Sequence, residues 1–220
     1  MAFLQTASAG VSVENRFGLA ELNQGCGLWA MPTSLGVFGV SVQHSGDALY
    51  NESKLRLAYA RTFGESLSGA LKFSYQTTFL GNHYGSRNAF LVEGGFQLRL
   101  KHKTTLGAYV FNPNRTLLSV DEQEPYQSVF RLGMQYKLSE KVGLFAEAKK
   151  QSLQPLLTKL GMEYQWVPAF YLRTGMASNP FQNSFGMGYV WQQLQLDFAL
   201  WRHPALGYVP QLSLSYQSKK

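Results

Sequence analysis

The chain has 220 residues, of which 45% are hydrophobic, 14% aromatic and only 15% charged. No apolar run approaches the ~20 residues of a membrane-spanning helix, which excludes a helical membrane protein. Its one cysteine, Cys26, excludes an internal disulfide. The formal net charge is +7, but Lys and Arg are spread along the whole chain, so we predict one domain over residues 1–220 with no nucleic-acid partner.

Side chains alternate between apolar and polar from the first predicted strand, at 7–15, through the first half of the chain. In residues 52–61, Leu55 and Leu57 fall on one face and Arg56 on the other. The pattern recurs in residues 68–79, with Leu71 and Phe73 opposite Lys72 and Ser74, and in residues 90–100, with Phe96 and Leu98 opposite Gln97 and Arg99. A helix would space its apolar residues by three and four, so a period of two predicts strands with one apolar face.

The second half continues the alternation, and the links between strands alternate in length. Further alternating segments cover residues 130–138, 160–166, 194–201 and 212–216. Short links at 32–34, 64–66, 101–103, 139–141, 167–168 and 192–193 take turns with longer ones at 45–51, 80–87, 112–126, 151–154, 178–182 and 203–207. Outer-membrane barrels have short periplasmic turns and longer extracellular loops. We therefore predict an all-β fold, a closed antiparallel transmembrane β-barrel of about fourteen strands in the bacterial outer membrane. The barrel must close because an open edge would expose unpaired backbone N–H and C=O groups to lipid.

The charged residues of the strands are predicted to face the lumen. A Lys or Arg on the lipid side at the bilayer midplane costs roughly 2–4 kcal/mol. The predicted lumen-facing charges are Lys54, Arg56, Lys72, Arg99, Arg131, Lys137, Lys149, Lys159 and Arg173, with Glu93, Glu147, Glu163 and Asp197. Two interpretations remain open: a positively biased path for an anion or amphipathic acid, and a packed polar core that conducts nothing, which we prefer.

Residues that could support catalysis or metal binding are scattered. The four histidines, His44, His83, His102 and His203, fall in links or at strand ends and lack metal-ligand spacing. There is no nucleophile elbow and no phosphate loop. We predict that the protein is not an enzyme and has neither a cofactor nor a metal site.

The longest predicted link, at 112–126, combines charge with apolar surface. We expect it to be an extracellular contact for other outer-membrane proteins or lipoproteins. Its contact residues would be Arg115, Leu117, Leu118, Val120 and Tyr126.

Several stretches together resemble a family of Bacteroidota outer-membrane barrels. They are residues 9–11 and 14–17, Pro32-Thr33 with 36–40, the run 49–54 leading into 57–61, and Arg202-His203-Pro204 with Leu206-Gly207 and Pro210. That family is similar to the PorV/PorQ-like proteins of the type IX secretion system and, more distantly, to the long-chain fatty-acid transporters. Its members carry a hatch segment before the barrel. This chain begins about where the hatch would end, so we expect signal and hatch to be absent from it.

The functional expectation that follows is an accessory subunit. We predict a non-enzymatic structural component of a multi-protein outer-membrane complex, for protein secretion or outer-membrane protein assembly, in contact with membrane lipids. The alternative is a transporter of hydrophobic or amphipathic solutes. It would be distinguished by an apolar groove leading from the loops to a gap in the wall. A lipid-modifying enzyme ranks last.

Overall fold

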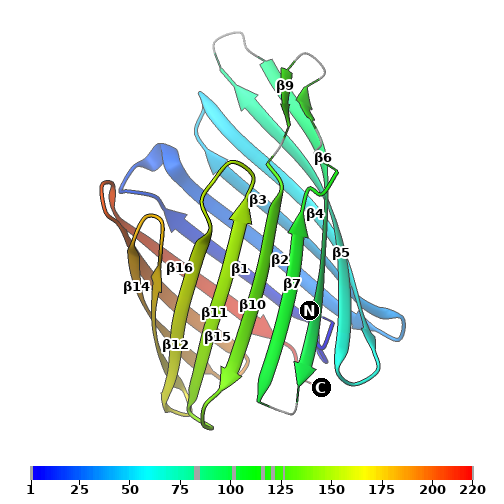
Figure 1. Cartoon of the computed structure of the whole chain (residues 1–220), viewed down its shortest axis with the longest axis vertical. Coiled ribbons are helices and arrows are strands. Elements are labelled where there is room, and N and C mark those ends of the chain that lie inside the picture. Colours follow the sequence, from blue (N-terminus) through cyan, green and yellow to red (C-terminus); the bar gives the residue numbers. More distant parts are fainter. Residues whose placement is uncertain are drawn as a thin grey trace.

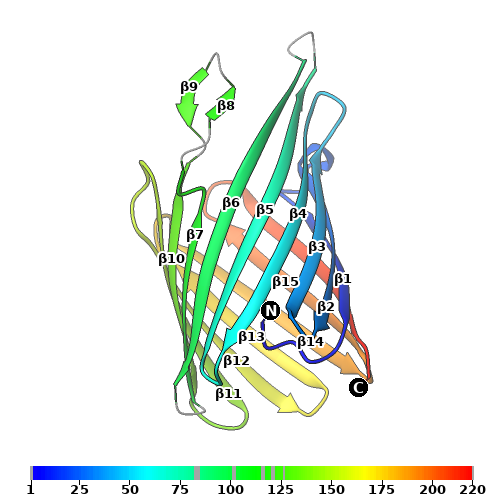
Figure 2. The same ribbon diagram turned by 90° about the vertical axis from the view of Figure 1, so that its right-hand side faces the viewer.

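The protein is a closed β-barrel of fourteen antiparallel strands (Figures 1 and 2). The computed structural model describes residues 2–81, 85–100, 103–114, 117–119, 122–125 and 127–219. The barrel strands are β1 (Ser8–Asn15), β2 (Asn23–Thr33), β3 (Gly36–Gly46), β4 (Tyr50–Phe63), β5 (Leu67–Leu80), β6 (Gly85–Leu100), β7 (Thr104–Phe111), β10 (Val129–Lys137), β11 (Val142–Gln151), β12 (Leu157–Val167), β13 (Phe170–Ala177), β14 (Gln182–Trp191), β15 (Leu194–His203) and β16 (Gly207–Gln217). The predicted fold class and strand number are confirmed.

Every strand pairs with its neighbour in the chain, and β1 pairs with β16 to close the sheet. The sequence did not predict a second, two-stranded sheet of β8 (Leu117–Ser119) and β9 (Glu122–Pro125) within the link between β7 and β10. This hairpin projects beyond one end of the barrel, whereas both termini lie toward the opposite end (Figure 2). A short 3-10 helix, η1 (Ala20–Leu22), lies between β1 and β2. No described helix is long and apolar enough to cross a membrane.

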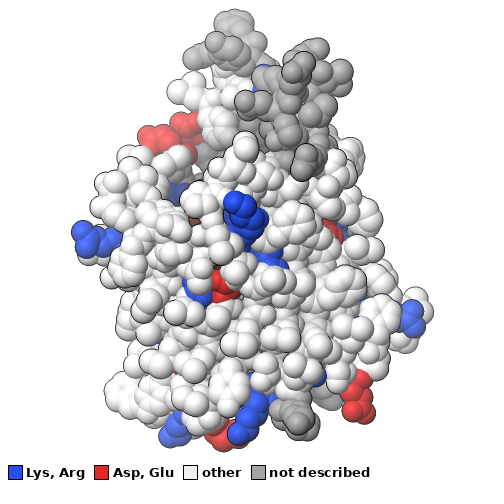
Figure 3. All heavy atoms as spheres, in the orientation of Figure 1, with Lys and Arg blue, Asp and Glu red and all other residues white. Residues whose placement is uncertain are grey.

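The period of two in the sequence becomes two faces of the barrel wall. Leu55 and Leu57 on β4 are exposed on the outside, as are their register partners Tyr75 and Phe73 on β5. Such apolar side chains cover most of the exterior, and acidic or basic residues are few on the face seen in Figure 3. The alternate positions therefore face the lumen.

One predicted long link is shorter than expected because a side chain caps it. Residues 45–51 were expected to form this link. In the structure, β3 extends to Gly46 and β4 already begins at Tyr50. The carboxylate of Asp47 accepts hydrogen bonds from the backbone N–H groups of Leu49 and Tyr50, both at 2.9 Å. These bonds, the one from Tyr50 first, hold the pKa of Asp47 below its ordinary value.

This cap predicts a pH dependence of the link. Because the pKa of Asp47 is lowered by folding, its contribution is complete above the pKa of the unfolded chain and is lost as the pH falls through the folded value. We expect carboxyl NMR of the refolded barrel to show Asp47 titrating below the ordinary value of an aspartate. Titration of Asp47 at the ordinary value of an aspartate would contradict the cap.

Candidate functional site

The structure brings the predicted lumen charges together as pairs on neighbouring strands. Lys72 and Glu93 are direct register partners of β5 and β6, with 2.6 Å between Nζ and Oε2. Glu147 and Lys159 are partners of β11 and β12, at 3.3 Å. Antiparallel pairing places opposite residues on the same face, so residues far apart in the sequence become ion pairs through register.

Glu93 is the centre of the most buried polar group in the wall. Only 3% of this residue is exposed, and its carboxylate accepts hydrogen bonds from Ser74 (2.9 Å) and from the hydroxyl of Tyr109 (2.5 Å), in addition to the pair with Lys72. A buried carboxylate is stable only when its oxygens are satisfied in this way. Sequence reasoning missed Tyr109, although its alternation with Ala108 and Val110 on β7 would have placed it in the lumen.

Removing the charge of Glu93 should therefore destabilise the barrel. We expect Glu93→Gln to lower the free energy of unfolding by about 2 kcal/mol, less than for a fully buried partner, because Lys72 keeps a third of its side chain exposed. Urea unfolding in lipid vesicles measures this. Glu52, which pairs with Lys54 at 3.2 Å, keeps 24% of its side chain exposed, so Glu52→Gln should cost only roughly 0–1 kcal/mol. Equal losses in the two variants would refute the special role of burial.

A second charged group lies farther around the lumen and is centred on Arg173 of β13. Its guanidinium donates to Glu163 of β12 at 2.7 Å and to Asp197 of β15 at 2.5 Å. Gln195 donates to both oxygens of Asp197, at 3.1 and 2.9 Å. Asp197 can reach Arg173 because the intervening register positions on β14 are Gly186 and Gly188. This group links β12, β13 and β15 across the glycines of β14 without leaving an isolated charge.

Two bases in the same lumen lack an acidic partner. Arg131 of β10 and Lys149 of β11 are direct register partners, and no described carboxylate forms an ion pair with either. The Arg131 guanidinium lies 5.4 Å from the ring centre of Tyr109. Like charges directly opposite one another on a sheet are destabilising. Glu147, two residues before Lys149 on the same face of β11, is already paired with Lys159, so the basic pair is a site of excess positive charge inside the barrel.

The remaining predicted residues lie apart from these groups. Arg56 donates to the amide oxygen of Gln43 at 2.7 Å. Arg99 stacks on the ring of Phe3 at 3.4 Å, so the segment before β1 reaches across to β6. Of the predicted partner loop, Arg115, Val120 and Tyr126 lie outside the described residues. Leu117 and Leu118 belong to β8, where only the backbone is described.

The lumen contains a chamber rather than a filled core along half of its wall. A cavity of about 1040 Å³ is lined by residues from β6 round to β15. Charged side chains of Glu147, Lys159 and Arg173 line it together with the apolar Phe145 and Trp201. Small residues such as Gly133 leave room for it. The preferred interpretation of a packed polar core thus fails for this half of the lumen.

The wall has an apolar groove on its outer face, and no gap beside it. The groove crosses β4 to β10, and Pro113, in the link after β7, lies at one end of it. All neighbouring barrel strands remain hydrogen-bonded in the described residues. The groove expected of a transporter is therefore present without the expected opening.

Several solved structures share this fold. No protein-family model and no curated protein matches the chain. The Pseudomonas putida toluene transporter TodX superimposes with a TM-score of 0.70 at 10% identity, over 97% of this chain and 89% of that chain. A Pseudomonas aeruginosa FadL homologue gives 0.68 at 13% identity, over 98% and 91%. The KdgM porin gives 0.54 at 9% identity, over 96% and 99%. The chain is thus a FadL-like barrel in fold, integral to the outer membrane.

These comparisons correct the functional expectation. The prediction of an accessory subunit for secretion or outer-membrane assembly is wrong. TodX is described as a toluene transporter and CymD as a monoaromatic hydrocarbon channel. The physical error was to assume that the charged lumen is filled, whereas pairing of the charges along the wall leaves the chamber open. The resemblance to the long-chain fatty-acid transporters holds at the level of the fold. The comparisons do not support the resemblance to Bacteroidota barrels or to the PorV/PorQ-like proteins of the type IX secretion system.

Proposed function

We propose that the protein transports hydrophobic or amphipathic solutes across the outer membrane, without enzymatic activity. The open chamber in the lumen carries the proposal. Its volume of about 1040 Å³ lies just above the roughly 300–1,000 Å³ of small-molecule sites. Apolar Phe145 and Trp201 offer surface to a hydrocarbon, and the paired charges around them can stay paired while a solute passes.

The basic pair, Arg131 and Lys149, extends the proposed solute class to amphipathic acids. A carboxylate between these two strands would supply negative charge beyond that of Glu147, which is already paired with Lys159. Charge-assisted hydrogen bonds to Lys or Arg are about twice as strong as neutral ones. The similarity in fold to hydrocarbon channels is consistent with the apolar part of such solutes.

Uptake measurements test this function directly. Cells of a bacterial host that expresses the barrel should take up radiolabelled toluene and a radiolabelled medium-chain carboxylate faster than cells with an empty vector. The protein must be shown to reach the outer membrane in folded form, by its altered gel mobility without heating. Folded protein with no increase in uptake of either probe would overturn the proposal.

A further inference from the structure

The groove on the outer wall has the dimensions of a binding site. Its volume is about 790 Å³, and it runs over β4, β5, β6, β7 and β10. Its outward-facing walls include Phe63, Leu71, Phe96, Phe130 and Leu132, all of them more than half exposed. This face contacts the bilayer, so any occupant comes from within the membrane or from a membrane-bound partner.

The groove is hollow because small residues occupy the middle of two register rows. Gly94 lies between Leu71 and Val110, and Ala108 lies between Phe96 and Leu132. A Cβ atom on Gly94 would approach Leu71 only to 3.6 Å, which is ordinary contact. The space above Gly94 is therefore free in the described structure and can accept a side chain or a ligand.

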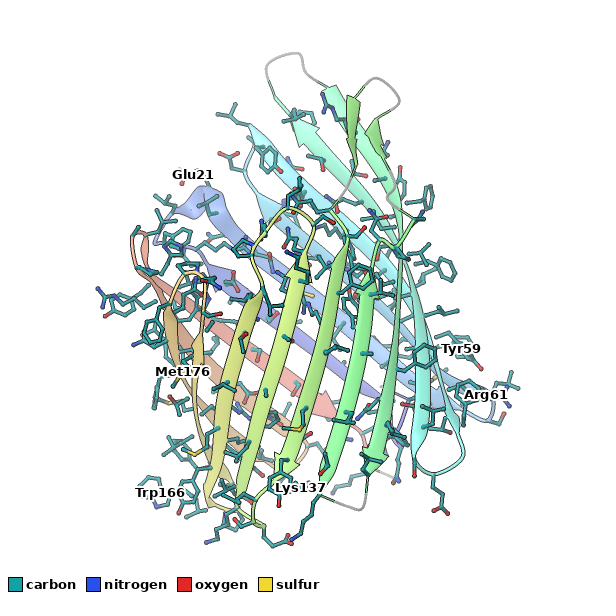
Figure 4. The ribbon with its side chains drawn as sticks, viewed as in Figure 1. Glu21, Tyr59, Arg61, Lys137, Trp166 and Met176 are labelled. Atoms are coloured by element: carbon teal, nitrogen blue, oxygen red, sulfur yellow. The ribbon has the colours of Figure 1, made fainter. Side chains whose placement is uncertain are left out.

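Of the two arginines that line this groove, Arg131 faces the lumen and only Arg61, at one end of the groove, faces outward. Arg61 of β4 is exposed and lines the groove, and Figure 4 shows it on the outside of the barrel. No described side chain forms an ion pair or a hydrogen bond with it. It lies two residues before Phe63, where β4 ends in one of the short turns of the periplasmic side. An outward-facing Arg costs only about 0–1 kcal/mol near such an interface.

We infer that this groove binds a phospholipid of the periplasmic leaflet, with its phosphate on Arg61 and an acyl chain over Gly94 and Ala108. The charge decides between possible occupants: an apolar groove with one unpaired guanidinium at the interface complements one anionic head joined to an apolar chain. Arginine binds phosphate through two parallel hydrogen bonds. A neutral hydrocarbon in transit would leave Arg61 without a partner. The site is independent of transport through the lumen.

Native mass spectrometry of the full chain tests the inference. The barrel is reconstituted with phosphatidylglycerol, extracted in mild detergent and scored for retained lipid. Arg61→Gln removes the phosphate contact, and Gly94→Leu fills the groove. Arg202→Gln is the matched control, since Arg202 faces outward on β15. Its guanidinium carbon lies 5.9 Å from the centre of the Tyr208 ring. Gly27→Leu is the second control, because Gly27 faces outward on β2 with nothing within 4 Å of its Cβ position.

We expect one phospholipid on the wild-type barrel and on both controls. The Arg61→Gln variant should retain about tenfold less lipid, because it loses a charge-assisted hydrogen bond to the phosphate. The Gly94→Leu variant should also retain about tenfold less lipid, because it loses the contact with the acyl chain. Equal retention by wild type and Arg61→Gln overturns the inference, whatever Gly94→Leu shows. So does equal retention of diacylglycerol, which lacks the phosphate, or the recovery of a bound protein in place of lipid from native membranes.

Discussion

Uptake of toluene through the barrel is expected to fall to the level of the empty vector when Gly133 is replaced by phenylalanine. Gly133 faces the chamber from β10, and a Cβ atom there would meet only the backbone oxygen of Ala146, at 3.8 Å. A phenylalanine is therefore accepted by the strand and projects into the chamber. The variant obstructs the proposed path without removing any charged pair.

The control for this obstruction places the same ring on the other face of the wall. Ala148 of the neighbouring strand pairs with the outward-facing Leu132, so Ala148→Phe points toward lipid. We expect it to transport like the wild type. Uptake by folded Gly133→Phe equal to that of Ala148→Phe would mean that solutes do not pass through the chamber. Loss of uptake in both variants would show a defect in folding or insertion, which gel mobility detects.

Neutralising the basic pair is expected to separate transport from stability. In the double variant Arg131→Gln/Lys149→Gln, uptake of a medium-chain carboxylate should fall by about tenfold or more, as expected for lost charge-assisted hydrogen bonds. Uptake of toluene should remain, because toluene carries no charge. The barrel itself should become more stable by roughly 0.2–1 kcal/mol, since two like charges directly opposite each other are removed.

The two readouts of this variant make the outcome decisive. Urea unfolding measures stability, and the uptake of the two probes is compared in the same cells. Lys137→Gln serves as the control, because it removes a base from the same face of β10 at the periplasmic end. Loss of stability would mean that Arg131 and Lys149 have a structural partner. Equal loss of carboxylate and toluene uptake would mean that the variant narrows the lumen instead of removing an anion site.

The sequence by itself determined the class of fold, because alternation is a local property. Leu55, Arg56 and Leu57 are adjacent in the chain, and their opposite faces follow from the geometry of any strand. The alternation of short and long links similarly determined the number of strands. The strand boundaries at Asp47 shifted because a side chain caps the backbone there, which residue type alone did not reveal.

Only the tertiary structure decided which charges meet and where space remains. Lys72 contacts Glu93 because the register of β5 and β6 places them opposite each other. Arg131 faces Lys149 because the register of β10 and β11 does the same. The sequence shows that these residues share the lumen face, and it does not show which of them are opposite. The outer groove likewise requires Leu71, Gly94 and Val110 of three strands to align in one row. Pairing between strands is cooperative and nonlocal, so these sites emerge only when the sheet closes.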